Sequence, residues 1–140
     1  MGRRASRELA MKLLYQTEIQ KSNRKEQIER ALTENKLTSK DKAYVSEILE
    51  GVFDNTEFID RLIEKYSKGW KINRLSKVDL SILRLSIFEI HYMEDIPVSV
   101  SVNEAVELAK KYSGDEMAPF INGILGKLTN LRVLRPSTDE

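Results

Sequence analysis

The sequence has no cysteine, only one histidine, three prolines and six glycines among its 140 residues. Without cysteine there is no disulfide bond, no thiolate metal site and no cysteine nucleophile. The single histidine, His91, has no second histidine to share a metal or a proton with, so a structural role is favoured. No apolar run approaches the roughly 20 residues that a transmembrane helix needs, and no secretory signal follows the basic start. We therefore expect a cytoplasmic protein with no cofactor, no metal and no membrane contact.

Catalytic signatures are also missing. The sequence contains no Walker loop, no G-x-G-x-x-G, no G-x-S-x-G and no calcium-binding loop. Glu104 and Glu107 share one face of a predicted helix, but helical surfaces carry such carboxylate pairs routinely. Nothing in the sequence indicates an enzyme, and we expect a binding protein.

Charge is nearly balanced over the whole chain but not at its amino end. The 23 Lys and Arg residues and 22 Asp and Glu residues leave a formal net charge of +1, which points to no particular partner. Near the start, however, Arg3, Arg4, Arg7 and Lys12 stand against one acid, Glu8. Such a cluster is either a solvated terminus or a focused positive field that attracts a polyanion. Charge alone does not decide between the two.

Apolar residues recur mostly at helical spacing, which predicts an all-α fold. A hydrophobic fraction of 41% and a charged fraction of 32% are typical of a globular chain. The length suits one domain with one core, which we place over residues 1–140. About seven helices are predicted, near residues 4–20, 25–34, 39–53, 58–66, 78–93, 101–113 and 119–131.

Polar residues and proline predict where these helices begin. Ser39 is the expected N-cap of the third helix. Ser101 and Glu104 have the spacing of a capping box for the sixth helix, and Pro119 suits the first position of the seventh. The segment 98–102 alternates like a strand, but no second strand is available to pair with it, so we interpret it as a helix entry.

The fifth helix is apolar on nearly every side, which predicts that other helices surround it. Ser76 is its expected N-cap, with Asp79 at the third helical position. Asp79 and Arg84 interrupt the apolar pattern, and buried charges need partners. We expect Arg84 to pair inside the protein, whereas Asp79 could pair internally or face another protein. Three residues ahead of this helix are expected to pack on the core: Trp70, Ile72 and Leu75.

The first helix carries the strongest sign of a binding surface. Arg4, Arg7, Met11 and Tyr15 fall within a sector of about 80° on a helical wheel, opposite the expected core stripe. Guanidinium groups bind phosphates, and an aromatic face offers an unpaired base a stacking platform. Alternatively, Met11 and Tyr15 pack against a second neighbouring helix. The expected core stripe consists of Ala5, Leu9, Leu13 and Thr17.

Two further sets of residues extend this surface if the helix ends approach each other. Lys110 and Lys111 close the sixth helix, and Phe120 opens the seventh. The lysines are explained equally by the negative end of a helix dipole, which the sequence alone favours.

Four segments, spread in order over most of the chain, resemble the NusB family of transcription antitermination proteins. The resemblance is specific as a set rather than in any one piece. The segments are Arg3–Glu8 leading to Leu14–Gln16, Asp79–Leu85 leading to Phe88–Glu89, Pro97 leading to Asn103–Lys110, and Phe120–Leu125.

The resemblance implies two perpendicular helical bundles that share a long central helix. It also implies a function: binding a single-stranded boxA element of nascent, notably ribosomal, RNA together with the tenth protein of the small ribosomal subunit, called NusE in this role. The pair then helps to assemble a complex on RNA polymerase that suppresses termination. Some family members form homodimers that cover the RNA face, so a homodimer is also compatible with the resemblance.

By position, the resemblance assigns RNA contacts to the first helix and to the start of the last one. Asp79 matches the acidic position that faces the ribosomal protein, whereas Arg84 and Asn122 are given structural roles. The segment Met117–Pro119 departs from the family, which often has a basic residue before the aromatic one, so RNA contacts from this loop are not predicted. The alternative is a helical adaptor that binds only protein. The residues assigned to RNA are Arg3, Arg4, Arg7, Tyr15 and Phe120, to which the basic helix end adds Lys110 and Lys111.

Overall fold

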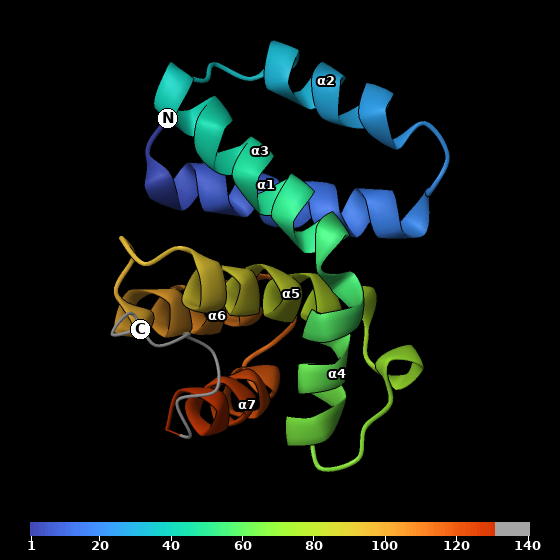
Figure 1. Cartoon of the computed structure of the whole chain (residues 1–140), viewed down its shortest axis with the longest axis vertical. Coiled ribbons are helices and arrows are strands. Elements are labelled where there is room, and N and C mark those ends of the chain that lie inside the picture. Colours follow the sequence, from blue (N-terminus) through green and yellow to red (C-terminus); the bar gives the residue numbers. More distant parts are fainter. Residues whose placement is uncertain (131–140) are drawn as a thin grey trace, which may run out of the picture.

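The computed structural model describes residues 1–130, and in this part of the chain it contains seven α-helices, one short 3-10 helix and no strand (Figure 1). The all-α prediction and the number of helices are confirmed. Leu131, expected on the core face of the last helix, lies outside the described residues. The α-helices are α1 (Arg3–Ile19), α2 (Arg24–Glu34), α3 (Ser39–Asp54), α4 (Thr56–Tyr66), α5 (Lys77–Tyr92), α6 (Val98–Tyr112) and α7 (Met117–Asn130), and the 3-10 helix is η1 (Ile72–Arg74).

The helices form two groups around α5. Figure 1 shows α1, α2 and α3 together at the top and α4, α6 and α7 around α5 below. Contacts of α5 reach α1, α3, α4, α6 and α7, and every residue from Asp79 to Ile90 is buried. The prediction of a central helix is confirmed, because a helix covered on all sides is mostly apolar. Its buried charges, Asp79, Arg84 and Glu89, all have partners within the chain. At 16 residues α5 is no longer than α1, which has 17.

The beginning of α3 differs from the prediction by one residue. Thr38, not Ser39, is the N-cap, and its hydroxyl accepts a hydrogen bond from the Asp41 amide at 3.1 Å. The Asp41 carboxylate accepts one from the Thr38 amide at 3.0 Å, which completes a capping box. Ser39 lies two residues before Asp41, so it does not have this spacing. The predicted cap of α5 is confirmed, because the Ser76 hydroxyl accepts a hydrogen bond from the Asp79 amide.

The starts predicted for α6 and α7 were too late. Helix α6 begins at Val98 after Pro97, so the segment 98–102 is helical, as predicted, but Ser101 and Glu104 do not cap it. Their side chains instead reach other helices. Helix α7 begins at Met117, which makes Pro119 its third residue rather than its first. Proline is tolerated there because amides in the first turn have no partner within the helix.

The buried face of α1 is wider than predicted. Leu13 and Thr17 are buried as expected, but Ala5 is exposed and Leu9 is only partly buried. Arg7 and Met11, predicted on the outer sector, are 3% and 2% exposed. The reason is that α1 packs against both α3 and α5, so its covered sector spans two neighbours. Only Arg4 and Tyr15 of the predicted outer group reach the surface.

No helix within residues 1–130 is both long and apolar enough to cross a membrane.

Candidate nucleic-acid interface

A row of side chains on α1 faces solvent along its whole length. Arg4, Lys12 and Tyr15 are exposed along this helix, with the side chain of Arg4 81% exposed and Tyr15 39% exposed. Arg3, also exposed, lies with its guanidinium carbon 4.3 Å from the centre of the Tyr44 ring. Such a cation–π contact orients the arginine without neutralising it. The row therefore combines positive charge with one exposed aromatic face.

Arg7 belongs to the interior rather than to this row. Its guanidinium donates to the Glu89 carboxylate of α5 at 2.7 and 3.3 Å and to Glu104 of α6 at 3.3 Å. Glu89 is fully buried and also accepts hydrogen bonds from the hydroxyls of Tyr44 and Ser101. This Glu89 network joins α1, α3, α5 and α6, which places its role in positioning the helices rather than in contact with a ligand.

The electrostatics of the network agree with that role. Burial by itself would lower the pKa of Arg7, but the hydrogen bonds and charges of Glu89 and Glu104 outweigh it and raise the pKa. Burial, together with the neighbouring Glu89 carboxylate, raises the pKa of Tyr44. Arg7 therefore stays charged and Tyr44 stays neutral, so each donates to Glu89.

Arg4 is exposed but not free. Its guanidinium donates two hydrogen bonds to Glu104, at 3.0 and 2.8 Å. This bidentate bond is the main reason why the pKa of Glu104 is lowered. Because Glu104 is also held by Arg7, its carboxylate presents Arg4 at the surface in a fixed direction. A phosphate could take the place of the carboxylate, since the two match the guanidinium fork in the same way.

The carboxyl end of α6 lies beside α1 and adds the predicted lysines. Lys111 donates to Glu8 at 3.0 Å, and Lys12 lies 3.5 Å from the other oxygen of the same carboxylate. A hydrogen bond from Tyr112, with these two lysines, lowers the pKa of Glu8. Lys110 lies 3.7 Å from Glu107 on the same helix. The structure therefore brings Lys111 to the α1 surface, as expected if the helix ends approach each other.

These residues line a shallow groove of about 380 Å³ between α1 and α6. Its cations are paired with carboxylates, which hold the head groups in place, and those of Arg4, Lys110 and Lys111 remain exposed. An incoming phosphate would compete with Glu8 and Glu104 for them. The groove is lined by Arg4, Arg7, Glu8, Glu104, Glu107, Leu108, Lys110 and Lys111.

Phe120 lies at the start of α7, half-buried rather than fully exposed. Its ring meets that of Trp70 edge to face, with the centroids 6.4 Å apart. Trp70 is 51% exposed, so the expectation that it packs into the core was wrong, although Ile72 is partly buried and Leu75 buried. Trp70 precedes η1 in the connection from α4 to α5, where the chain passes over the surface.

Asp79 is buried at the start of α5, and its carboxylate is engaged within the chain. One oxygen accepts a hydrogen bond from Ser113 at 2.6 Å and the other from Ser76 at 2.9 Å. Asp79 therefore ties the end of α6 to the beginning of α5. Asp79 is only 3% exposed, so a protein partner would contact the residues around it rather than the carboxylate itself.

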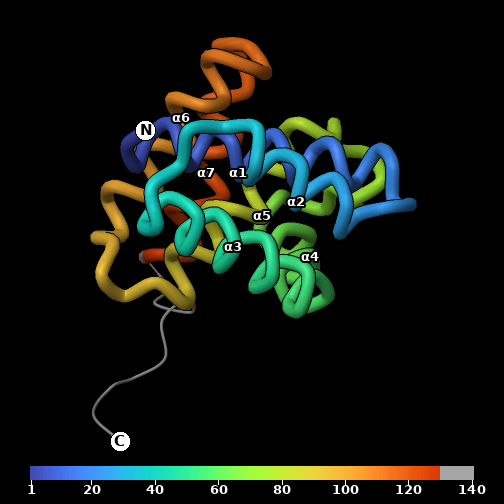
Figure 2. Tube along the Cα trace, turned by 90° about the horizontal axis from the view of Figure 1, so that it is seen from above, coloured from blue at the N-terminus to red at the C-terminus, as the bar shows by residue number. Residues whose placement is uncertain are grey.

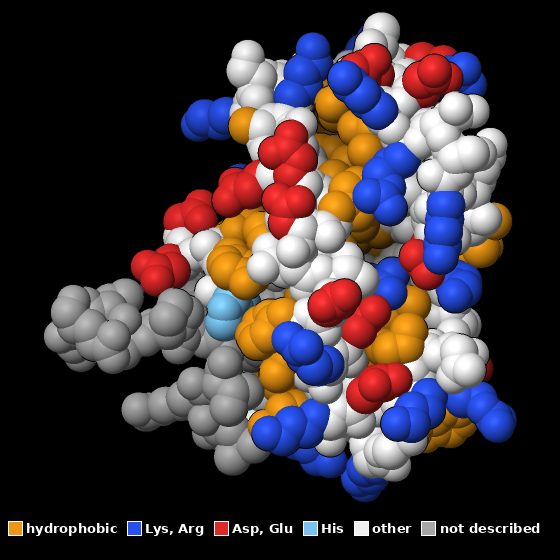
Figure 3. All heavy atoms as spheres, turned by 45° about the vertical axis from the view of Figure 1, so that its right-hand side comes forward, with side chains coloured by type: hydrophobic (Ala, Val, Ile, Leu, Met, Phe, Trp, Pro, Cys, Tyr) orange, Lys and Arg blue, Asp and Glu red, His pale blue; other side chains and the backbone are white. Residues whose placement is uncertain are grey.

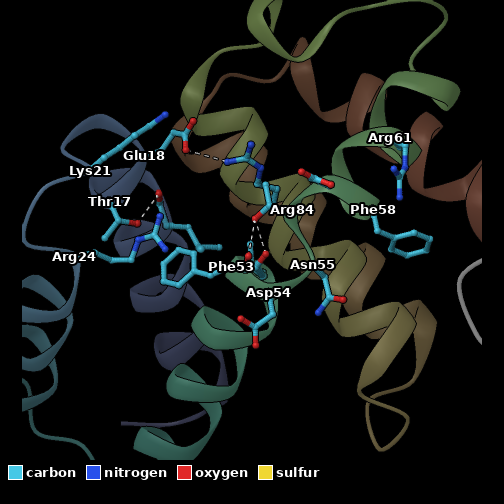
Figure 4. Close-up of a pocket in the computed structure, with 14 residues that line it drawn as sticks. Thr17, Glu18, Lys21, Arg24, Phe53, Asp54, Asn55, Phe58, Arg61 and Arg84 are labelled. Atoms are coloured by element: carbon cyan, nitrogen blue, oxygen red, sulfur yellow. Dashed lines mark hydrogen bonds and ion pairs between the residues drawn. The ribbon is translucent and has the colours of Figure 1, made fainter.

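Arg84 has the internal role expected for it. Its guanidinium donates two hydrogen bonds to Asp60 of α4, at 2.9 and 2.8 Å, and one to Glu18 of α1, at 3.2 Å. It stands at the wall of a groove of about 660 Å³ between the ends of α1 and α3, where Figure 4 shows Glu18 beside it. Lys21, Arg24 and Arg61 line this groove together with acidic residues.

Charges of both signs also mix over the face shown in Figure 3, where Lys and Arg (blue) are interspersed with Asp and Glu (red). By charge the two grooves are alike, because each is lined by four cations and three carboxylates. The α1–α6 groove differs in lying beside the exposed row of Arg4 and Tyr15 on α1, and we therefore consider it the candidate site for a polyanion.

Several residues of the interface could not be singled out from the sequence. Glu89 and Glu104 lie in helices that were predicted, but the partner that they share, Arg7, lies 82 and 97 positions before them in the sequence. From the sequence, Lys12 was identified only as part of the basic cluster near the amino end. Trp70 was predicted to pack on the core. No local pattern marks a pairing across that distance.

Comparison with known proteins supplies independent information. The NusB family model matches residues 4–130. The chain is 56% identical over its full length to a transcription antitermination protein NusB of Acetivibrio thermocellus, covering 97% of that protein. It is 60% identical over 129 residues to the NusB protein of Ruminiclostridium cellulolyticum, a match that covers 92% of this chain and 89% of the relative.

Solved NusB structures also share the fold of this chain. The NusB of T. maritima superimposes with a TM-score of 0.86 at 34% identity and covers 93% of this chain and 92% of its own. A second structure contains the antitermination factors NusB and NusE in complex with double-stranded RNA. Its match has a TM-score of 0.81 at 26% identity and covers 91% of this chain and 96% of that one.

Proposed function

The chain belongs to the NusB family, and from this premise we propose that it binds single-stranded boxA-type RNA through the α1–α6 groove and the exposed row of α1. As a member of this family it is a transcription antitermination factor and not an enzyme. Its partners are RNA and the ribosomal protein NusE, with which a related NusB has been solved. We place it in the cytoplasm, where RNA polymerase produces the nascent transcript, and treat residues 1–140 as one domain.

The observation that carries the proposal is the combination of Arg4 and Tyr15 on one exposed row, with Lys111 beside it. Phosphate groups would replace the Glu104 and Glu8 carboxylates at Arg4, Lys12 and Lys111. An unpaired base would stack on the exposed face of Tyr15. Stacking requires a base that is not already stacked in a duplex, so the row favours single-stranded RNA.

The predicted contacts divide into two groups by their accessibility. We propose that Arg3, Arg4, Tyr15 and Lys111 touch RNA directly, because all four are exposed, and that Lys110 does so at the edge of the groove that it lines. Arg7 is bonded to two carboxylates and buried, so we assign it the positioning of Glu104 and, through Glu104, of Arg4. Phe120 is half-buried, and we propose that it contacts RNA only at its exposed edge.

We propose that NusE docks at the surface around the start of α5. Through its hydrogen bond with Ser113, Asp79 holds the end of α6 against the start of α5. In this proposal Asp79 therefore fixes the relative position of the two helix ends that NusE would contact. A partner seated there would lie close to the RNA groove, because Lys111 and Ser113 are neighbours on the same helix end. Binding of NusE and of RNA would then support each other.

The proposal is tested by measuring the affinity of the full chain for a boxA RNA, with and without NusE, at several salt concentrations. Arg4→Ala should weaken binding and lower the salt slope by about 0.7 per lost phosphate contact. Tyr15→Ala should weaken binding by about 1–3 kcal/mol, the usual worth of a stacked base. Both variants should fold as the parent does.

Matched controls are available on other faces. Tyr92 has an exposure of 41%, close to that of Tyr15, and Arg30 is exposed on α2. Tyr92→Ala and Arg30→Ala should leave the RNA affinity unchanged. If boxA RNA fails to bind even with NusE present, the chain is an adaptor that binds only protein. Equal affinity for the same sequence as a duplex would contradict the single-stranded assignment.

A further inference from the structure

Trp70 is the only tryptophan of the chain and one of its most exposed large apolar residues. It follows Lys68 and Gly69, whose positive φ angles of 58° and 89° bend the chain sharply after α4. Exposing half of so large a ring forgoes the free energy that burial would contribute. Trp70 stays at the surface after this bend, although Leu75 from the same connection reaches the core.

The exposed ring forms one wall of a small pocket. The pocket has a volume of about 240 Å³ and lies between the end of α4, the Trp70 loop and the first turns of α7. The contact with Phe120 holds the Trp70 ring at a steep angle to that of Phe120, and Trp70 remains half exposed beside the pocket. This Trp70 pocket is lined by Tyr66, Ser67, Lys68, Trp70, Pro119, Phe120, Gly123, Ile124 and Lys127.

The pocket also carries positive charge. Lys68 and Lys127 are both exposed and stand at its rim. Within residues 1–130 neither forms an ion pair, in contrast to Lys12, Lys110 and Lys111. No acidic side chain is among the lining residues. An aromatic face between two uncompensated cations is complementary to a nucleobase with a phosphate on either side.

The Trp70 pocket continues the proposed RNA surface rather than standing apart from it. Lys111 of α6 lines the α1–α6 groove, and the short connection 113–116 leads from this helix to α7, whose Phe120 lines the pocket. In the view from above in Figure 2 the connection from α6 to α7 projects beyond α1. A strand that leaves the α1–α6 groove past Lys111 and follows this connection would reach Phe120 and then Trp70.

We propose that the Trp70 pocket binds one unstacked nucleobase of the single-stranded RNA, stacked on the indole, with the flanking phosphates held by Lys68 and Lys127. This inference rests on the proposed function and adds a second stacking site to that of Tyr15. Charge favours RNA as the occupant, because the pocket is lined by two lysines for which the described part of the chain supplies no ion pair. The stacking is tolerant of base identity, since every base has a face to offer.

The test uses the intrinsic fluorescence of the full chain, in which Trp70 is the only indole. A boxA oligonucleotide titrated alone should quench the emission and saturate at the concentration that gives half-maximal binding by an independent method. Trp70→Ala should weaken binding by about 5- to 150-fold, as for the loss of one stacked base. Trp70→Phe should lose less, because it keeps an aromatic face. Lys68→Ala and Lys127→Ala should each reduce the salt slope by up to about 0.7.

Three results would overturn the inference, and they differ in what they say about the proposed function. If RNA binds in an Arg4-dependent way but leaves the emission and the Trp70→Ala affinity unchanged, the pocket is not an RNA site and the proposed function stands. If NusE alone changes the emission and RNA does not, Trp70 belongs to a protein interface. If no RNA binds with or without NusE, both proposals fail. Tyr92→Ala serves as the control for a change of exposed aromatic area, and thermal unfolding verifies that each variant is folded.

Discussion

At the scale of single residues, Arg4 and Arg7 show how neighbours on one helix can serve different purposes. They share the carboxylate of Glu104, but the side chain of Arg4 is 81% exposed and that of Arg7 only 4%. Arg4 can exchange its carboxylate for a phosphate at the surface. Arg7 cannot do so without leaving Glu89 buried and without its charge partner.

This difference predicts that the two alanine variants affect different properties of the protein. Arg7→Ala should lower the free energy of unfolding by about 3–5 kcal/mol, because it strands the buried Glu89 carboxylate. Arg4→Ala should leave stability nearly unchanged and act on RNA affinity. Urea unfolding of both variants measures the first effect and RNA titration the second. An Arg7→Ala protein as stable as its parent, with lost RNA binding, would return Arg7 to the contact residues.

At the scale of elements, the ends of the helices determine where the interface residues point. Helix α6 begins at Val98, and therefore Ser101 and Glu104 lie within it and face Glu89 and Arg4 instead of capping its start. In α3 the capping box of Thr38 and Asp41 secures the start, and Ser6 of α1 donates to Asp41 at 3.0 Å. The cap of α3 therefore also fixes the position of α1.

Thr38→Ala should destabilise the protein by about 1 kcal/mol, the usual value for a lost N-cap. Ser39→Ala is the matched control, since Ser39 is the first helical residue and its hydroxyl makes no cap. Its effect should stay within a few tenths of a kcal/mol, which is typical of exposed substitutions. Thermal unfolding of the two variants distinguishes the caps, and a larger loss for Ser39→Ala would contradict the structure.

At the scale of the whole molecule, carboxylates join the two groups of helices. Glu8 and Glu104 connect α1 with α6, and Glu18 connects α1 with Arg84 and Lys77 of α5. Although burial raises the pKa of Glu18, the Arg84 charge and hydrogen bond outweigh it and lower the pKa overall. The pKa values of Glu8 and Glu104 are lowered as well, and the hydrogen bonds that the Asp41 carboxylate accepts from the Thr38 amide and the Ser6 hydroxyl lower its pKa to about 2.

These lowered pKa values predict an acid-sensitive fold. A carboxyl group whose pKa is lower in the folded state stabilises the protein fully above its unfolded value, and this contribution is lost as the pH falls through the folded value. For Asp41 the loss falls between about pH 4 and pH 2, and for the glutamates it begins below about pH 4.5. The free energy of unfolding should decrease steadily below pH 4.5. A value that stays constant down to pH 3 would show that these ion pairs do not stabilise the fold.

The sequence by itself determined the seven helices, the cap of α5, the burial of α5 on all sides and the family. Each of these follows from patterns within about a turn of helix or from an ordered set of motifs. Helical periodicity also placed Arg4 and Tyr15 on one side of α1. It could not tell how wide the covered sector is, because that depends on how many helices pack against it.

Only the tertiary structure decided which charges are exposed and which are paired. Arg7 and Glu89 come together over 82 positions of sequence, and the exposure of Trp70 depends on how α7 and the end of α4 meet around its loop. Burial of a charge or an aromatic ring is a property of the neighbours that the fold supplies. For this reason the charged first helix was recognisable from the sequence, while the division between the arginine at the surface and the one inside was not.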